Sequence, residues 1–503
     1  MNYDLLNYLK SLNNHDWLWC YENNSDRELN DDGYNNRQFE QLINARLAQI
    51  SALIAECSDK PAIFIVETKP INFIAAFLAG VITRVDLFLG DPAWQRQEWQ
   101  QVLNIVQPDL ILGDDTIKSL IAKLKLTLQK TQQPPNLIIN AKFTEFIDRS
   151  LIMIPTGGTS GKIKFAIHSW DTLTASVTGF QNFFNCQKIN SVCTLPLYHV
   201  SGLMQLMRSL LTQGNLIICP YQLVATKLNQ LNKSDYFISL VPTQLQFLLK
   251  STPNCLQKFK AVLLGGAPAK RSLLTTAREY NVPIALIYGM TETASGVVAL
   301  KPQDFLAGNN SSGEVLPHAQ VKIDNPNPQL ISSVEELALE NRKLFKDRAS
   351  VIQINSASLC LGYYPQLFPP QQSLTTDDLG YFDSDGYLHL LGRNSQKIIT
   401  GGENVFPTEV EAVIYSTKLV KDICVVGIPD RKWGQAVTAI YVPLTSSTNL
   451  TLNSIKQQIQ GQLSKYKQPK NWLQVDSIPR NDRGKVNYQQ LKAIAIQAIN
   501  SKQ

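Results

Sequence analysis

The sequence predicts an α/β protein with a large N-terminal domain of two α/β lobes plus a small β unit, followed by a small mobile α+β C-terminal domain. From Ala62 to Ile287, short apolar runs alternate with helical patterns, which is typical of a mostly parallel sheet. Short alternating strands with turns follow in residues 313–391, and a second mixed region closes the chain. The 503 residues, of which 44% are apolar, are enough for more than one core.

The first lobe is predicted from Phe39 onward. Apolar residues at helical spacing predict an amphipathic helix over Phe39–Cys57. The run INFIAAFLAGVI at Ile71–Ile82 predicts a buried helix, because it is too short to span a bilayer and contains Asn72. The remaining predicted elements are the strands Ala62–Val66, Val85–Leu89 and Leu110–Leu112 and the helix Arg96–Val106.

The second lobe is predicted after a glycine-rich stretch at residues 156–161. Helix Trp170–Phe184 opens it, and turns at 196–202 and at the GGAP sequence of 265–268 interrupt the alternation of strands and helices. The other predicted elements are the strands Val192–Leu195, Leu216–Cys219, Tyr236–Val241, Ala261–Leu264 and Ile284–Ile287 and the helices Leu203–Thr212, Val224–Leu231 and Thr243–Leu249.

A domain boundary is predicted near Ser395, inside the charged and glycine-containing stretch Gly392–Gly402, which we interpret as a hinge. This boundary divides the chain into an N-terminal domain of residues 1–394 and a C-terminal domain of residues 395–503. The predicted elements of the second domain are the helices Pro407–Tyr415 and Thr451–Leu463 and the strands Lys421–Val426, Thr438–Val442 and Asn471–Val475.

Composition and charge exclude several classes of protein. The net charge of +6 is small for this length and the basic residues are scattered, so no nucleic-acid surface is expected. The eight cysteines form no CxxC pair, and the five histidines form no zinc motif, which indicates reduced thiols and no structural zinc site. The N-terminus has no signal-peptide pattern, so we expect a cytoplasmic protein without a membrane span.

The stretch IPTGGTSGKIKFAIH at Ile154–His168 carries the strongest chemical signal. A strand leading into such a glycine-rich loop directs backbone N–H groups into an anion-binding concavity. Glycines let the backbone approach a phosphate closely. Hydroxyl and ammonium groups add donors, so the stretch predicts a polyphosphate-binding loop. The alternative is a Gly/Ser/Thr surface turn. The predicted phosphate ligands are Thr156, Gly157, Gly158, Thr159, Ser160, Gly161 and Lys164, with Lys162 as a second cation.

The loop does not match a Walker sequence, although Gly161 and Lys162 supply a Gly-Lys pair. A Walker loop has a glycine where Thr156 stands and a magnesium-binding Ser or Thr where Ile163 stands. A P-loop nucleotide hydrolase is therefore not indicated.

Two further stretches suggest nucleotide contacts. YGMTET at Tyr288–Thr293 follows a strand, and in it Tyr288 is expected to stack on a base, Gly289 to permit a tight turn and Thr291 to donate to a phosphate. Glu292 offers a hard oxygen ligand, and Mg²⁺ on a triphosphate needs only one or two carboxylates. In TTDDLG at Thr375–Gly380, a carboxylate is suited to accept both hydrogen bonds from a ribose diol. The alternative for each stretch is an ordinary polar turn.

Three stretches near the predicted hinge and the C-terminus carry polar groups. The sequence LGR places Arg393 where it could reach a phosphate or a sugar. GGENVFPTE at Gly401–Glu409 combines a glycine turn with a Pro-Thr helix start, and RNDRGKV at Arg480–Val486 carries Lys485 in a polar turn. Taken separately, solvated side chains and an ordinary loop-to-helix junction remain the alternatives.

The order and spacing of these stretches resemble the adenylate-forming superfamily of acyl-CoA synthetases, luciferases and peptide-synthetase adenylation domains, from about residue 35 to residue 495. The resemblance implies a fold with a mobile C-terminal domain, the co-substrates ATP and CoA, and Mg²⁺. It implies a phosphate loop at the glycine-rich stretch, Glu292 on Mg²⁺, Asp378 on the ribose, Arg393 of a G-R motif and Lys485 as the catalytic lysine. It also implies nucleotide contacts from Gly265, Gly266, Ala267, Tyr288, Gly289, Thr291 and Gly402.

The sequence departs from the family pattern at several positions. In the phosphate loop, Gly157 replaces a usual Ser or Thr, Ile163 a usual Pro and Phe165 a usual Gly. Asp377 stands where the T-G-D motif has its glycine, and the hinge residue, often Asp or Lys, is Ser395. A loop with an extra glycine and without the proline is expected to be looser and to depend more on ATP for its order.

Within the superfamily, PLYHVSGL at residues 196–203, SLVPTQL at 239–245 and the phosphate-loop variant resemble the branch that ligates 2-succinylbenzoate to CoA in menaquinone and phylloquinone synthesis. The implied partners are an aromatic carboxylic acid, ATP and CoA, and a homo-oligomer is left open. His199 is expected to line or gate the acyl pocket, with a core or turn histidine as the alternative. Arg208 and Ser201 are candidates for reading the succinyl carboxylate.

The implied reaction has two steps, acyl-adenylate formation and transfer of the acyl group to CoA. Rotation of the C-terminal domain would withdraw Lys485 and bring Gly401–Glu403 toward the CoA tunnel, where Trp433 is a candidate contact, with buried packing as its alternative. Another aryl- or acyl-CoA ligase and a non-catalytic nucleotide-binding relative are the competing hypotheses.

Overall fold

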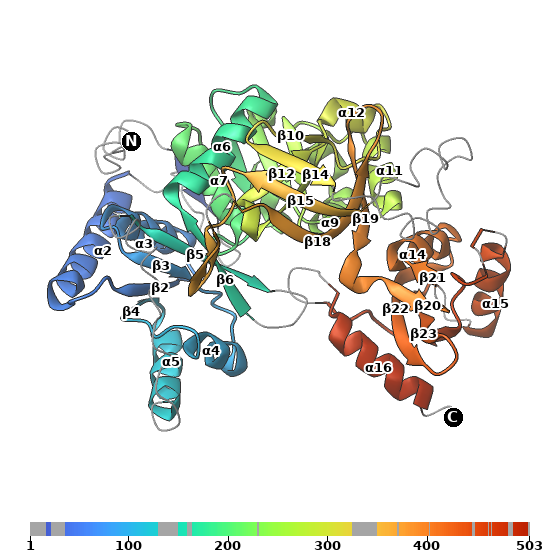
Figure 1. The fold of residues 1–503 in the computed structure, drawn as a ribbon. Helices are drawn as coiled ribbons and strands as arrows, with labels where there is room; N and C mark the ends of the chain where they lie inside the picture. Colours follow the sequence, from blue (N-terminus) through green and yellow to red (C-terminus); the bar gives the residue numbers. More distant parts are fainter. Residues whose placement is uncertain are drawn as a thin grey trace.

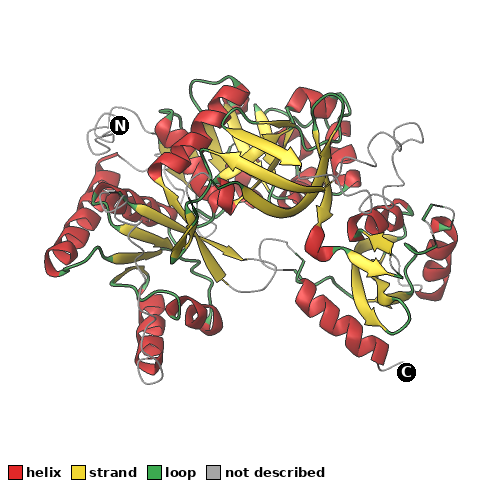
Figure 2. Cartoon of the chain, in the orientation of Figure 1, coloured by secondary structure: helices red, strands yellow, loops and turns green. Residues whose placement is uncertain are grey.

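The computed structural model describes residues 17–21, 36–128, 149–157, 163–228, 231–323, 350–369, 372–401, 403–444, 448–460, 462–463, 465–480 and 486–500. They form a large N-terminal domain and a small C-terminal domain, and in each domain helices cover the faces of β-sheets (Figure 1, Figure 2). The predicted α/β class with a large first domain, a small β unit and a small second domain is therefore confirmed.

The first sheet has the strand order β17-β16-β6-β5-β3-β2-β4. Strands β5, β3, β2 and β4 are parallel, whereas β6 pairs with β5 in antiparallel fashion. Helices α2 and α3 lie on one face and α4 and α5 on the other (Figure 1). The bounds are α2 Asn36–Glu56, β2 Ala62–Val66, α3 Pro70–Ile82, β3 Asp86–Leu89, α4 Arg96–Leu103, β4 Leu110–Gly113, α5 Asp115–Leu128, β5 Leu151–Gly157, β6 Ile163–Ser169, β16 Gly362–Tyr363 and β17 Gln366–Leu367.

The second sheet has the order β1-β8-β7-β9-β10-β11-β12-β13, of which the strands from β1 to β11 are parallel. Residues of α6 and α7 share one hydrophobic core with α3, so the two lobes pack against each other. The bounds are β1 Leu18–Cys20, α6 Trp170–Phe184, β7 Asn190–Cys193, α7 Val200–Leu211, β8 Leu216–Ile218, α8 Val224–Lys227, β9 Tyr236–Leu240, α9 Pro242–Ser251, α10 Pro253–Leu256, β10 Ala261–Leu264, α11 Arg271–Glu279, β11 Ile284–Met290, β12 Ser295–Ala299, α12 Pro302–Leu306 and β13 Glu314–Val315.

Two smaller sheets complete the described structure. The antiparallel sheet β14-β15-β18-β19 is the predicted β unit, and the C-terminal domain contains β21-β20-β23-β22 with β24 beside β23. Its helices α14, α15 and α16 lie around that sheet (Figure 1). The bounds are β14 Ala319–Ile323, β15 Ser350–Ser356, β18 Leu374–Phe382, β19 Leu388–Arg393, β20 Ile398–Thr400, β21 Glu403–Val405, α14 Pro407–Ser416, β22 Val420–Asp430, β23 Gly434–Pro443, α15 Thr448–Ile459, β24 Asn471–Gln474 and α16 Tyr488–Asn500.

Local sequence explains why helix α6 begins and ends where it does. The backbone N–H of Thr172 donates to the hydroxyl of Ser169 at 3.3 Å, and the backbone N–H of Ser169 donates to the hydroxyl of Thr172 at 3.0 Å. This reciprocal capping satisfies donors that a helix start otherwise leaves unpaired. The helix ends at Phe184, and the next residue, Asn185, adopts the left-handed conformation with φ 47°.

Several predicted elements differ from the structure. The segment after the glycine loop forms strand β6, which was not predicted, and α7 begins at Val200 instead of Leu203. TTDDLG lies within strand β18, so the alternative of an ordinary polar turn does not apply there. Elements β1, α5 and α16 were not predicted.

Two features predicted from composition concern the cysteines and the membrane. All eight cysteines are free thiols, as expected. In the described part of the chain no helix combines the length and apolar character needed to cross a membrane.

Candidate active site

A cavity of about 3250 Å³ opens where the two domains meet. Its floor includes residues that directly follow the parallel strands β7, β9, β10 and β11, which is the usual binding edge of an open α/β sheet. The volume exceeds the roughly 300–1,000 Å³ of a typical ligand pocket, so more than one substrate fits. The predicted site residues that line it are Thr156, His199, Gly265, Gly266, Ala267, Tyr288, Gly289, Thr291, Glu292, Asp378 and Arg393.

The predicted phosphate loop connects the two strands of a hairpin. Strand β5 carries Thr156 to its end, and Gly157 pairs with Ile163 of β6. Residues Gly158, Thr159, Ser160, Gly161 and Lys162 lie outside the described residues. Because a strand rather than a helix follows the loop, its flanks also differ from those of a Walker loop.

Glu292 is held by a tyrosine that the sequence analysis missed. The Tyr363 hydroxyl donates to Glu292 Oε1 at 2.7 Å, and Lys164 Nζ lies 5.1 Å from the centre of the Tyr363 ring. Strand β16 places Tyr363 there by pairing it with Ala166 of β6. Burial and the adjacent carboxylate raise the pKa of Tyr363, so it remains a donor at neutral pH.

The carboxylate of Glu292 suits an ion that the nucleotide itself largely coordinates. Among the described residues no group of three or more His, Cys, Asp or Glu side chains is placed to hold a metal ion. Glu292 lines the cavity with Thr156 and Thr291 at the end of β11. A lone carboxylate beside a phosphate site fits Mg²⁺, which is commonly bound by one or two carboxylates plus substrate phosphates.

Asp378 and Arg393 face each other across strands β18 and β19. They are register partners, and Arg393 Nε lies 3.3 Å from Asp378 Oδ1. The Tyr288 hydroxyl donates to Asp378 Oδ2 at 3.0 Å, and the Tyr288 ring packs in a hydrophobic cluster of the β unit. The three side chains therefore form one polar group at the cavity wall.

Glycines bring the backbone close to the cavity at two places. A Cβ atom on Gly289 would lie 1.9 Å from the carbonyl oxygen of Ser295, so its role is close strand packing rather than the tight turn predicted for it. Gly266 has φ +80°, a conformation that L side chains rarely adopt. It lets the GGAP turn follow β10 directly at the cavity floor.

His168 fixes the turn that carries Thr291 and Glu292. Its Nε2 lies 2.8 Å from the backbone oxygen of Thr291, and its Nδ1 lies 3.0 Å from Thr172 Oγ1. Because a carbonyl only accepts, Nε2 carries the proton in this arrangement. Complete burial lowers the pKa of His168 to about 4, so the ring is neutral at pH 7.

His199 caps the start of α7 at the cavity wall. It is 7% exposed, its Nε2 lies 4.0 Å from Asp91 Oδ2, and its ring stands edge-on to Tyr198. His199 therefore lines the cavity, and its role in an acyl pocket stays a prediction.

Arg208 is a buried cation in the same cavity. It is 5% exposed, its Nη2 donates to Ser295 Oγ at 3.1 Å, and its guanidinium stacks on Phe180 at 4.1 Å. Its Nε has no hydrogen-bond partner, and no ion pair among the described residues includes it. Burial lowers the pKa of Arg208 to about 10, so the charge persists at pH 7. Arg208 and Ser201 both line the cavity, where the sequence alone could not place them.

The C-terminal domain contributes the other wall. Lys485 and Gly402 lie outside the described residues, but Arg480 and Val486, on either side of Lys485, line the cavity. The backbone N–H of Gly401 donates to the carbonyl of Trp433 at 2.8 Å, and the half-buried Trp433 ring lies beneath the ammonium groups of two lysines.

Two protein-family models match separate parts of the chain. The model of the AMP-binding enzyme family matches residues 23–334, and the model of the AMP-binding enzyme C-terminal domain matches residues 409–485. The 2-succinylbenzoate–CoA ligase of Listeria monocytogenes serotype 4b is 30% identical over 415 residues, which are 81% of this chain and 83% of that protein. The ligase of the same name from Bacillus subtilis strain 168 is 31% identical over 412 residues, or 80% and 77%.

Solved structures share the fold. The o-succinylbenzoate CoA synthetase of Bacillus subtilis in complex with its acyl-adenylate intermediate has a TM-score of 0.77 at 24% identity, over 97% of this chain and 98% of that one. ATP-bound MatB of Rhodopseudomonas palustris has a TM-score of 0.76 at 21% identity, over the same shares of the two chains.

Proposed function

The chain belongs to the AMP-binding enzyme family, and we propose that it is an ATP-dependent acid–thiol ligase that converts 2-succinylbenzoate, ATP and CoA into 2-succinylbenzoyl-CoA, AMP and diphosphate. Menaquinone or phylloquinone synthesis uses this step. The reaction takes place in the cytoplasm, where ATP and CoA are both available. The N-terminal domain, residues 1–394, binds ATP and the acid, and the C-terminal domain, residues 395–503, supplies Lys485.

The observation that supports this substrate is the charge of Arg208, which has no ion-pair partner among the residues that the structure describes. A buried cation without a carboxylate partner is costly unless a ligand supplies the opposite charge. The acid has two carboxylates, one that reacts and one that does not. Arg208 pairs with the carboxylate that does not react, and Ser201 and His199 line the same cavity. A monocarboxylic acid of similar size would leave the charge unpaired.

The first step forms the acyl-adenylate. An oxygen of one carboxylate of the acid attacks the α-phosphorus of ATP, the bond from that phosphorus to diphosphate breaks, and diphosphate leaves. Glu292, oriented by Tyr363, would hold Mg²⁺, which neutralises phosphate charge when it is bound. Asp378 accepts from the ribose hydroxyls. Lys485 stabilises the charge that develops on the phosphate, an effect typically worth about 3 kcal/mol for one preorganised donor.

The second step transfers the acyl group. The sulfur of CoA attacks the carbonyl carbon of the adenylate, the carbon–oxygen bond to phosphate breaks, AMP leaves and the thiol proton is lost to solvent. Rotation of the C-terminal domain near Ser395 withdraws Lys485 and brings Gly401–Glu403 and Trp433 toward the thiol. Such a rotation gates turnover, because each arrangement supports only one of the steps.

An Arg208→Gln substitution tests the substrate assignment. We expect kcat/KM for 2-succinylbenzoate to fall roughly 100-fold, as for a lost hydrogen-bonded charge pair, and kcat/KM for benzoate to change little. Arg278→Gln is the matched control, because Arg278 also stacks on a phenylalanine, Phe305 at 4.2 Å, but does not line the cavity. Equal losses on both acids would assign Arg208 to folding alone.

A further inference from the structure

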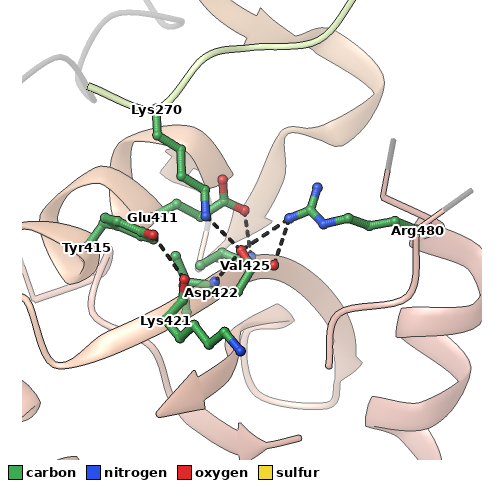
Figure 3. Close-up of polar contacts among 8 residues, drawn as sticks. Lys270, Glu411, Tyr415, Lys421, Asp422, Val425 and Arg480 are labelled. Atoms are coloured by element: carbon green, nitrogen blue, oxygen red, sulfur yellow. Dashed lines mark hydrogen bonds and ion pairs between the residues drawn. The ribbon is translucent and has the colours of Figure 1, made fainter. Parts of the chain in front are cut away.

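The carboxylate of Asp422 joins the two domains through its contacts with Lys270 and Arg480 (Figure 3), and both of these basic residues line the active-site cavity. Asp422 lies near the start of β22 in the C-terminal domain. Lys270 Nζ of the N-terminal domain donates to its Oδ1 at 2.9 Å, and Arg480 Nη2 donates to Oδ1 at 3.1 Å and to Oδ2 at 2.9 Å. One carboxylate therefore receives two cations that come from opposite sides of the cavity.

Lys270 connects this contact to the GGAP turn, whose residues line the cavity. It follows the GGAP turn by two residues and precedes α11, so its position depends on the segment that contains Gly265 and Gly266. Its ammonium also lies 4.3 Å from the ring centre of Tyr415, whose hydroxyl donates to the carbonyl of Lys421 at 2.9 Å. Lys270 thus contacts both α14 and β22 of the C-terminal domain.

Arg480 connects the same contact to residues 481–485, the segment that contains the proposed catalytic lysine. It precedes Lys485 by five positions, and it forms an isolated β-bridge with Val486, which directly follows that lysine. Arg480 and Val486 both line the cavity. The ends of the segment are therefore joined to each other, and one end is bound to Asp422.

Asp422 is the charged carboxylate of this cluster. Burial alone would raise its pKa, but the hydrogen bonds and charges of Lys270 and Arg480 lower it. The neighbouring Glu411 is buried and accepts from the backbone N–H of Val425 at 2.7 Å, and burial raises its pKa to about 7. The ion pairs of Asp422 are partly exposed, so the contact is reversible rather than permanent.

We propose that Asp422 is a positioning residue which, by binding Lys270 and Arg480 together, holds the C-terminal domain in the orientation that presents the Lys485 segment to the cavity. The proposal rests on the proposed function for the role of Lys485. Among the described residues, those flanking Lys485 line the cavity in this orientation, whereas Gly401 and Glu403 do not. Asp422 therefore favours acyl-adenylate formation, and its pair with Lys270 must break before the acyl group is transferred to CoA.

Zero-length crosslinking tests this directly. Treating the full chain with a water-soluble carbodiimide converts an ammonium and a carboxylate in contact into an amide, with loss of water. We expect mass spectrometry to find a peptide pair joined through Lys270 and Asp422. The crosslinked enzyme should retain acyl-adenylate formation and lose most transfer from supplied adenylate to CoA. Lys270→Arg is the matched control, because it keeps the charge but cannot be crosslinked in this way.

Substitution gives an independent readout. We expect Asp422→Asn to slow acyl-adenylate formation about tenfold and to leave transfer from supplied adenylate unchanged or faster. Lys421→Gln is the control, because the neighbouring Lys421 ammonium points away from the cluster (Figure 3). Equal slowing of both steps, or a crosslinked enzyme that still transfers to CoA, would overturn the proposal. The crosslinked peptide is detected without turnover, so failure of the proposed function remains distinguishable from failure of this contact.

Discussion

The carboxylate of Asp377 accepts two hydrogen bonds from Ser395, in the turn of residues 394–396 that follows β19. The backbone N–H of Ser395 donates to Asp377 Oδ1 at 2.9 Å, and its hydroxyl donates to Asp377 Oδ2. Both residues are departures from the family pattern, one at the glycine of the T-G-D motif and one at the proposed hinge. The structure therefore shows that the two departures contact each other, which no single motif indicated.

This contact predicts the local stability of the proposed hinge. Replacing Asp377 with Ala removes the acceptor, and a lost cap of this kind costs about 1 kcal/mol. We expect hydrogen exchange of the Ser395 amide to accelerate roughly fivefold in Asp377→Ala. Ser395→Ala keeps the backbone hydrogen bond, so its amide should stay protected. Unchanged exchange in Asp377→Ala would mean that the cap does not order the hinge.

Tyr363 is predicted to set the magnesium requirement. Tyr363→Phe removes the hydrogen bond to Glu292 and leaves the carboxylate free to rotate, so we expect the Mg²⁺ concentration for half-maximal rate to rise severalfold. Glu292→Gln should raise it further. Tyr364→Phe is the control, since that neighbouring ring packs edge-on against Phe88 instead. A titration with unchanged Mg²⁺ dependence in Glu292→Gln would remove Glu292 from the metal site.

His168 predicts how stability depends on pH. Its pKa is about 4 in the folded chain against an ordinary 6.5, so the unfolded chain binds more protons between these values. Stability is then fully present above pH 6.5 and is lost as pH falls toward 4. Between pH 7.5 and pH 5, His168 should account for about 2 kcal/mol of the loss in the free energy of unfolding.

Chemical denaturation at the two pH values checks this. His168→Gln cannot gain a charge, so its free energy of unfolding should fall less than that of the wild type over the same interval. Parallel losses in the two proteins would show that His168 does not titrate in this range.

Lys485 is predicted to act in one half of the reaction. Because its charge is needed where phosphate charge develops, Lys485→Ala should lose acyl-adenylate formation by at least about 100-fold, as for a removed oxyanion donor. Transfer from supplied adenylate to CoA should be nearly unaffected. Release of diphosphate and formation of the thioester measure the two steps separately, and equal loss in both would contradict the assignment of Lys485 to one domain orientation.

The sequence predicted the buried elements best. Strand Ala62–Val66 and helix Trp170–Phe184 have the predicted bounds, because an apolar run between polar turns and a capped amphipathic pattern mark their ends. Strand β6 was missed because it directly follows the glycine-rich stretch and contains Lys164, so its start reads as part of the loop. Its strand conformation depends on pairing with β5 and β16, which lie elsewhere in the chain.

Only part of the candidate site could be predicted, because some of its residues lie in local motifs and others act through contacts between distant parts of the chain. Motif residues such as Glu292, Asp378 and Arg393 carry a local pattern and do line the cavity. Tyr363, His168 and Asp422 act through contacts with residues 71, 123 and 152 positions away, and no local pattern reports such contacts. Arg208 could be named as a cation, but only the fold shows that it is buried and faces the cavity.

The central claim is the identity of the acid, and a thioester assay by mass spectrometry tests it most directly. The wild-type chain would be incubated with ATP, Mg²⁺, CoA and, separately, 2-succinylbenzoate, benzoate, a cinnamate and a medium-chain fatty acid. We expect 2-succinylbenzoyl-CoA and AMP, with a rate for this acid far above the others. Preferential turnover of another acid would contradict the assigned substrate, and no thioester from any acid, with ATP still bound, would contradict the assignment as a ligase.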